Sequence, residues 1–460
     1  MRKLFYYVTN DFGGGGTNVS RFFSYIDLLE GSGVRLLINY YFLENDFVDK
    51  TGFNTKELSK LKTYSEFYDF VSDIQKKFIS DGKVSKSYVK SKISYQPEIL
   101  IDSGSGNILR DSSEYILKNF TKIKDHYLDI IEKYHSFCEK HNIDYAIAMD
   151  LALKYTYKGN ESDNESYSAI REKIEEYIDA NKDLLDLTLG DYVKNDFHHS
   201  IIVPIHGANL DSYINYLLAV VDLEEKHRKR FDGFAIGGIG QISRIDVKNF
   251  MGAKSENTLD KIGAVCALIK RSRAIIDAKG DRRSLHILGS AGIKNLIAFI
   301  YAGATSFDCH TPWRRSSDGN LISKKSLKQN TPIDGAEWSK FLIPLLNSRL
   351  EVLPNDTVYK YADLNTINSN MGCDCLVCRK YPIGKIKELY CGDTEDNYFA
   401  KILIFIHAAW QYSFLLKKME IIIELDNSRK AVQDFVEQIA DKKFKDVNMY
   451  LINYIDNLDS

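Results

Sequence analysis

The 460-residue chain lacks a charge excess of either sign, because 61 lysines and arginines face 63 aspartates and glutamates and leave a net charge of -2. The overall charge therefore does not point to a polyanionic partner, and any contact with nucleic acid must come from local patches. Basic runs at residues 226–230, 83–92 and 324–328 are the candidates. A solvated helix or loop face is the more ordinary interpretation of each run taken alone.

Long apolar runs are also lacking. No stretch approaches the ~18 to 20 uninterrupted apolar residues of a membrane span. The N-terminal MRKLFYYVTN has no extended apolar segment followed by a small-residue cleavage site. Membrane and secreted classes are disfavoured, and we expect a cytoplasmic protein without a membrane partner. The hydrophobic content of 44% and the charged content of 27% are typical of a globular protein.

The chain has few cysteines, and their number is odd. Three of the seven cysteines are clustered as Cys373, Cys375 and Cys378. Without a secretion signal, such clustering indicates a metal site instead of disulfides. His407 lies on an apolar helical stretch, and three thiolates with one imidazole form a closed tetrahedral zinc site. We predict a structural Zn²⁺, with Cys391 competing with His407 for the fourth position.

Short β-branched and aromatic runs alternate with longer helical patterns. Strands are predicted at 4–8, 34–42, 98–101, 145–149, 201–205, 233–236, 285–288 and 306–309, with amphipathic helices at 113–140, 210–230, 258–278 and 293–302 and further helices after Trp410. Eight alternating units predict an α/β fold, a (β/α)₈ TIM-type barrel, because each parallel strand pair needs a crossover helix. A doubly wound open sheet is the structural alternative.

The predicted domain organisation follows from the strand positions. We expect the barrel to occupy residues 1–312, with an inserted segment at about 157–199, and residues 313–370 to form an insertion or connection. Residues 371–460 are expected to form the zinc-binding module and the C-terminal helices. The two long gaps exceed ordinary loop lengths and should contain inserted helices or functional segments.

Polar residues gather where the predicted strands end, which is where barrel enzymes place their chemistry. Asp102, Asp150 and Asp308 belong to the third, fourth and eighth strand ends, and His206 follows the fifth strand. Glycines after the sixth and seventh strands would let a flat ligand approach the backbone closely. A cap or turn role is the alternative for each aspartate alone. Paired carboxylates suit reactions at a glycosidic or N-glycosidic carbon, although a divalent-metal lyase fits the barrel equally well.

Taken together, these motifs resemble the tRNA-guanine transglycosylase family from about Ile99 to Ala440. The most specific parts are Asp102-Ser103-Gly104, Gly237-Gly238, the segment LHILGSAGIKNLIAFIYAGATSFDCHTPWRR and the cysteine–histidine module. The resemblance implies base exchange through a covalent aspartyl-glycosyl intermediate with retention. It assigns Asp308 as the nucleophile and Asp102 as the general acid/base, and it favours His407 over Cys391 as the fourth zinc ligand.

The resemblance also implies where the base and the polymer bind. The expected base-binding residues are Asp150, His206, Gly237, Gly238, Ser103 and Gly104. His206 stands where the family has a glutamine, and the aromatic residue of the family's DSGGF/Y-Q motif is absent from the run DSGSGN at residues 102–107. An extruded nucleotide needs a basic rim, for which Arg314 and Arg315 are the candidates, with a loop-capping surface pair as the alternative.

These departures, and the poor match of the first 95 residues, resemble the divergent branch that inserts a 7-deazaguanine into DNA in phage and bacterial modification systems. We therefore expect guanine in DNA to be exchanged for a 7-deazaguanine such as 7-cyano-7-deazaguanine, with tRNA as the alternative polymer. The resemblance implies the cytoplasm of a bacterium or of a phage-infected host, and a homodimer or a partner subunit.

Two other classes of protein compete with this hypothesis. A non-catalytic partner subunit is the first, but the presence of both Asp102 and Asp308 argues against it. A glycoside hydrolase is the second, and it leaves the zinc module unexplained.

Overall fold

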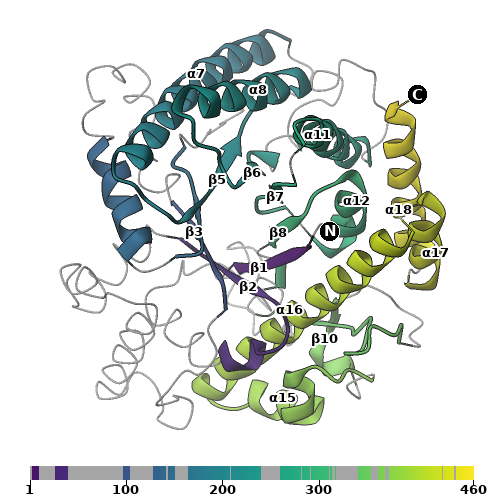
Figure 1. Cartoon of the computed structure of the whole chain (residues 1–460). Coiled ribbons are helices and arrows are strands. Elements are labelled where there is room, and N and C mark those ends of the chain that lie inside the picture. The colour runs from purple at the N-terminus through teal and green to yellow at the C-terminus, as the bar shows by residue number, and fades with distance from the viewer. Residues whose placement is uncertain are drawn as a thin grey trace.

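The structure, a computed structural model, describes residues 3–9, 26–39, 97–103, 128–140, 143–150, 164–207, 209–239, 259–280, 282–290, 292–309, 311–312, 316, 340–353, 361–367, 372–426, 428–439 and 442–459. At its centre lies a closed barrel of parallel strands (Figure 1). The strands are β1 (Phe5–Thr9), β2 (Arg35–Asn39), β3 (Ile99–Asp102), β4 (Tyr145–Ile147), β5 (Ser200–Ile205), β6 (Gly233–Ile236), β7 (Ser284–Ile287) and β8 (Ser306–Cys309).

Closure of the sheet decides between the two predicted architectures. Each strand pairs in parallel with the next one along the chain, and β1 pairs with β8, with Tyr7 opposite Asp308. An open doubly wound sheet would leave these two strands as edges. The TIM-type barrel is therefore confirmed, and each of the eight predicted strands overlaps an observed one.

Helices surround the barrel and carry the chain from one strand to the next (Figure 1). They include α7 (Asn164–Lys194), α8 (Leu210–His227), α11 (Leu259–Ala278) and α12 (Ile293–Ala302), and residues 128–140 are also helical. Asn209 begins α8 with a capping box, because its side chain accepts from the Ser212 N–H while the Ser212 hydroxyl accepts from the Asn209 N–H. Such crossovers require every strand to run in the same direction, so all the carboxyl ends meet at one opening, the mouth of the barrel.

The barrel interior changes from apolar to polar along its axis. Its central layer consists of Tyr7, Leu37, Leu100, Ile147, Ile202 and Ala235. At the amino ends of the strands, the Arg35 guanidinium lies over the Phe5 ring and pairs with Glu98. Alternation along the strands then turns Asp102 and Asp308 inward, because Asp102 lies two residues beyond Leu100 and Asp308 pairs with Tyr7. The predicted catalytic carboxylates thus face the barrel axis near the mouth.

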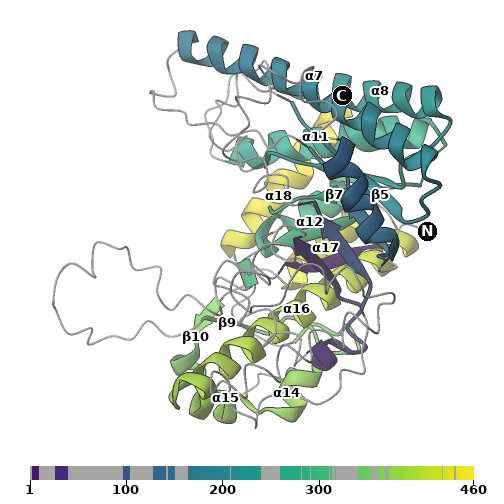
Figure 2. The ribbon, with the colours of Figure 1, turned by 90° about the vertical axis from the view of Figure 1, so that its left-hand side faces the viewer.

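The C-terminal region forms a helical layer against one side of the barrel (Figure 2). It contains β9 (Lys340–Leu342), β10 (Tyr361–Asp363), α14 (Leu376–Lys380), α15 (Ile383–Tyr390), α16 (Thr394–Leu425), α17 (Arg429–Ile439) and α18 (Lys442–Asp456). Helix α16 is joined to the region before β2, where the Trp410 indole N–H donates to the Leu28 carbonyl at 2.8 Å. The predicted helices after Trp410 are confirmed. The predicted domain boundaries at 157–199, 312, 313–370 and 371 stay predictions.

One helix among the described residues is long and apolar enough to cross a membrane. The segment is Phe399–Leu425 of α16, and 94% of its most apolar window is buried inside the molecule. Such burial is typical of a core helix, and the ring of Trp410 packs on that of Phe414 within this buried part.

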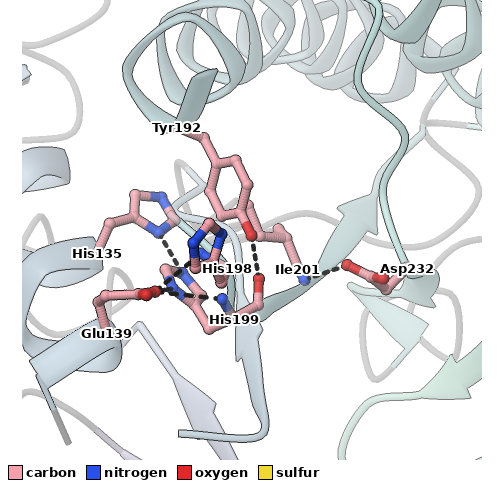
Figure 3. Close-up of polar contacts among 7 residues, drawn as sticks. All are labelled: His135, Glu139, Tyr192, His198, His199, Ile201 and Asp232. Atoms are coloured by element: carbon pink, nitrogen blue, oxygen red, sulfur yellow. Dashed lines mark hydrogen bonds and ion pairs between the residues drawn. The ribbon is translucent and has the colours of Figure 1, made fainter. Parts of the chain in front are cut away.

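A buried histidine pair lies at the barrel end opposite the mouth (Figure 3). His135 Nδ1 lies 2.8 Å from His199 Nε2, and the other His199 ring nitrogen lies 3.2 Å from the Glu139 carboxylate. A carboxylate only accepts, so the His199 Nδ1–H donates to Glu139 and the Nε2 lone pair accepts from the His135 Nδ1–H. Burial, with the nearby His199, lowers the pKa of His135 to about 3. This neutral pair joins the helix at 128–140 to the start of β5.

Candidate active site and metal centre

The Asp308 carboxylate is held on the inner wall of the barrel. Its side chain is 5% exposed, and its Oδ1 accepts from the Gly289 N–H at 2.8 Å. The same oxygen lies 3.0 Å from His286 Nε2. Gly289 has a φ of +69°, in the left-handed region that favours glycine, and this conformation aims its N–H at the carboxylate. Asp308 is thus a buried carboxylate bound by two donors on one oxygen.

A second aspartate–histidine pair lies at the ends of β4 and β5. The Asp150 Oδ2 is 2.8 Å from Nε2 of His206, which is 4% exposed. An ionised carboxylate only accepts, so Nε2 carries the hydrogen and Nδ1 is left as an acceptor when the ring is neutral. That Nδ1 is buried and has no hydrogen-bond partner among the described residues. The structure therefore brings the predicted base-binding residues Asp150 and His206 together.

Gly237 and Gly238 form the neighbouring wall, directly after β6. A Cβ on Gly237 would lie 2.7 Å from His206 Cε1, so the imidazole packs where only a glycine fits. Gly238 adopts a left-handed φ of +72°. The hydroxyl of Tyr213 on α8 donates to the Gly237 carbonyl at 2.7 Å and fixes this backbone. The backbone of these two glycines thus forms a surface without side chains beside the Asp150–His206 pair.

Asp102 lies at the carboxyl end of β3, opposite Asn39 of β2. The following Ser103 is fully buried. Strands β1 and β2 separate β3 from β8, so Asp102 and Asp308 stand on different walls of the barrel. This places the two carboxylates on separate sides of the space into which both face.

Three predicted site residues lie outside the described residues, namely Gly104, Arg314 and Arg315. The basic run at 226–230 is described, and it ends just before β6 begins. It therefore lies at the barrel end opposite the mouth, where Lys226 pairs with Asp186 at 2.7 Å and the Lys229 ammonium lies over the Tyr192 ring. This run cannot form the rim of the mouth.

Three residues that contact the site are not among the residues predicted from the sequence. His286, Ser306 and Tyr213 each contact a predicted site residue or its partner. A signal was present for His286, because it is the polar residue between Leu285 and Ile287 and shares the inward face with Ala235, its partner on β6. Tyr213 carried no such signal, since buried tyrosines occur throughout the helices.

The three clustered cysteines and His407 form a buried group. Their ligand atoms lie within 4.8 Å of one another. The His407 Nδ1 is 3.7 Å from the sulfur of Cys373, 3.5 Å from that of Cys375 and 3.3 Å from that of Cys378. A tetrahedral zinc ion with ordinary Zn–S and Zn–N bonds separates such atoms by about 3.6 Å. The donors therefore fit zinc, and all four positions belong to the protein.

The surroundings orient the imidazole toward the sulfurs. The His407 Nε2–H donates to the Leu342 carbonyl on β9 at 2.7 Å, which leaves the Nδ1 lone pair for the metal. The Phe341 ring stacks on His407 with centroids 4.0 Å apart, and the Gln411 amide donates to the Cys373 sulfur. Cys391, the competing ligand, is exposed at the end of α15 and is not a member of the group. His407 is thus confirmed as the fourth donor.

The charges of the cluster also favour a cation. Burial opposes a charge on His407, but the Cys373 thiolate and the hydrogen bonds to Cys373 and Cys375 outweigh it and raise its pKa to about 10. Burial opposes ionisation of Cys375 as well, yet hydrogen bonds from its cysteine and histidine neighbours lower its pKa well below the usual range. A buried group that holds negative charge and attracts a positive one is suited to a structural zinc ion.

A barrel with inward carboxylates at its mouth and a closed Cys₃His zinc centre on its C-terminal side defines a narrow class of barrel enzyme. A family model described as queuine tRNA-ribosyltransferase, TGT, matches residues 84–441, which is over three quarters of the chain. The chain belongs to this family, and it is a base-exchange transglycosylase, a pentosyltransferase. The comparison with individually curated proteins gives no match.

Proposed function

We propose that this enzyme replaces guanine in DNA with a 7-deazaguanine, such as 7-cyano-7-deazaguanine, through a covalent intermediate on Asp308. The observation that best supports the chemistry is the inward Asp308 carboxylate, held by donors from His286 and Gly289. Hydrogen bonds to its charged form favour an ionised carboxylate, which is the state that a nucleophile needs.

The exchange consists of two displacements at the same carbon. An Asp308 oxygen attacks C1′ of the target nucleotide, the C1′–N9 bond breaks, and its electron pair leaves with guanine, whose N9 takes a proton from the acid form of Asp102. The Asp102 carboxylate then takes the N9 proton of the incoming base. That N9 attacks C1′ and releases Asp308 as a carboxylate, so the configuration is retained and the protons balance.

The base is proposed to bind between the Asp150–His206 pair and the backbone of Gly237 and Gly238, with Ser103 and Gly104 next to the general acid/base. The Nδ1 of His206, which no described residue satisfies, supports this placement. Leaving a buried acceptor unpaired costs about 1–3 kcal/mol, and a donor on the base would remove this cost. Arg314 and Arg315, which follow Asp308 closely in sequence, are proposed to bind the polymer.

Two features support DNA as the polymer. The family match begins at residue 84, so the first 83 residues lie outside it although they contain β1 and β2. The segment after Asp102 also lacks the aromatic residue of the tRNA enzymes. The description of the matched family favours the alternative, exchange on tRNA. A non-catalytic partner subunit is the less favoured class, because both carboxylates are present and face inward.

The zinc ion has no step in this chemistry, because its four donors leave no open position and lie in the C-terminal module. Its contribution is to hold β9, α14 and α16 together. We also propose that the enzyme works in the cytoplasm of a bacterium or a phage-infected host, as a homodimer or with a partner subunit.

Incubation with labelled guanine and either duplex DNA or bulk tRNA tests the proposal, with Asp308→Asn as the matched inactive control. Label in DNA that requires Asp308 supports the proposal. Label confined to tRNA establishes the alternative polymer, and label in neither overturns the exchange for this chain. A repeat with labelled 7-cyano-7-deazaguanine identifies the incoming base.

A further inference from the structure

His286 occupies the wall beside Asp308 and is fully buried. Its Nε2 lies 3.0 Å from Asp308 Oδ1, and its Nδ1 lies 3.0 Å from the Ser306 hydroxyl. The Tyr7 ring on β1 meets the imidazole edge-on, with centroids 5.5 Å apart. The imidazole is therefore held on three sides by β1 and β8.

The chemistry of its partners determines the tautomer of His286. An ionised Asp308 only accepts, so the hydrogen must be on Nε2. In the neutral ring Nδ1 is then an acceptor, and the Ser306 hydroxyl donates to it. The resulting series of hydrogen bonds runs from the Ser306 O–H to Nδ1 of His286 and from its Nε2–H to the Asp308 carboxylate. Both ring nitrogens are satisfied without a net charge on the histidine, which suits a buried position.

We propose that His286 is the positioning residue of this transglycosylase: its Nε2–H, together with the Gly289 N–H, holds Asp308 ionised and in one orientation toward the barrel axis. This inference rests on the proposed role of Asp308 as the nucleophile. Two donors on one oxygen prevent rotation of the carboxylate. The same donors stabilise the carboxylate when it is released from C1′ in the second displacement.

The ring has no other charged neighbour among the contacts of the described residues. Tyr7 faces it from β1, and Ser306 and Asp308 face it from β8. The Arg35 guanidinium donates to the Tyr7 hydroxyl at 3.2 Å, and no contact among the described residues joins it to the imidazole. Removing the imidazole therefore acts on Asp308 directly. Loss of a hydrogen bond to a charged group corresponds to about a 10- to 100-fold change in an equilibrium or a rate.

The first test compares His286→Phe with His286→Gln in the full-length enzyme. We expect His286→Phe to lower kcat about 10- to 100-fold, with KM for the incoming base within about twofold. The acidic limb of its pH–rate profile should move about one unit to higher pH, because an Asp308 that has lost a donor is protonated more easily. His286→Gln keeps an N–H donor and should recover part of both effects. His199→Gln, which changes a buried histidine at the opposite end of the barrel, should leave kcat and the acidic limb unchanged.

A folded His286→Phe enzyme with an unchanged kcat and an unchanged pH–rate profile overturns the inference. Should that variant not fold, Ser306→Ala removes the Nδ1 partner with little change in volume and should shift the acidic limb in the same direction. A folded Ser306→Ala enzyme whose acidic limb does not shift also overturns the inference.

A measurement independent of turnover separates this inference from the proposed function. In a ¹⁵N-histidine NMR spectrum, the resonances lost in His286→Gln should be those of a neutral Nε2–H tautomer. An Nδ1–H tautomer at this position overturns the inference, whether or not the enzyme exchanges bases. Wild-type enzyme that labels no polymer refutes the proposed function, while the NMR spectrum still decides the tautomer.

Discussion

His206 Nε2 lies 2.8 Å from Asp150 Oδ2, and this contact ties the end of β5 to the end of β4. The pair resembles His286 with Asp308 in design, since each buried imidazole donates to an aspartate near the mouth. The two pairs differ in their second nitrogen. Nδ1 of His286 is paired with Ser306, whereas Nδ1 of His206 has no partner in the part of the chain that the structure describes. We therefore propose different roles for the two histidines: His286 orients the proposed nucleophile, and His206 binds the base.

Substitution of His206 should weaken binding of the base more than it slows the chemical steps. We expect His206→Ala to raise KM for the incoming base about 10- to 100-fold, because both the acceptor and the partner of Asp150 are lost. Steady-state kinetics with labelled base give KM and kcat separately. His227→Gln, a histidine paired with Asp186 at the opposite end, is the control. A His206→Ala enzyme with unchanged KM contradicts the assignment.

A methyl group at Gly237 should disturb the same site through sterics alone. The Cβ of Gly237→Ala would lie 2.7 Å from His206 Cε1, so the imidazole or the backbone must move. We expect base exchange to fall about tenfold or more while the protein stays folded. Gly384→Ala is the matched control, since nothing lies within 4 Å of its Cβ. Equal rates for the two variants in the labelled-base assay would count against this packing argument.

Zinc should be present at about one ion per chain and should stabilise the C-terminal module. Cys378→Ser removes a buried donor and should lower both the zinc content and the Tm, whereas Cys391→Ser changes an exposed cysteine outside the group and should alter neither. Metal analysis and thermal unfolding of the purified variants measure the two quantities. Stable, metal-free wild-type protein would refute the assignment.

The histidine pair at the opposite end predicts that stability falls in mild acid. Burial, helped by His199, lowers the pKa of His135 to about 3 in the folded state, while an unfolded histidine titrates near 6.5. Between these pH values the unfolded chain binds more protons than the folded one. The contribution of the buried neutral His135 to the free energy of unfolding is therefore complete above pH 6.5 and is lost as pH falls toward 3. The free energy of unfolding should fall by about 2 kcal/mol between pH 7 and pH 5 from this group alone.

Thermal unfolding at pH 7 and pH 5 measures this effect. His135→Gln, which cannot take up a proton, should show a smaller drop in Tm than the wild type. The exposed neighbour His198 provides the control, since His198→Gln should keep the full drop. Equal drops in all three proteins would show that the acid sensitivity has another source.

Much of the fold could be predicted from local patterns. Strand–helix alternation depends on side-chain periodicity along short segments, so the eight strands were recognisable before any long-range contact was known. Cys373, Cys375 and Cys378 are likewise so close in sequence that a short segment can supply three ligands to one metal ion. The inward direction of Asp308 depends on its pairing with Tyr7, because a one-residue shift in register would turn the side chain to the other face of the sheet.

The sequence by itself determined the barrel, the cysteine triplet and the aspartates near the strand ends, because these features depend on residue order over short distances. The tertiary structure confirmed that His407 and not Cys391 completes the metal group. Only the tertiary structure decided that His286 contacts Asp308 and that the basic run at 226–230 lies away from the mouth. His407 follows Cys378 by 29 residues and Asp308 follows His286 by 22. Such partners are brought together by barrel closure and helix packing, which depend on the whole chain.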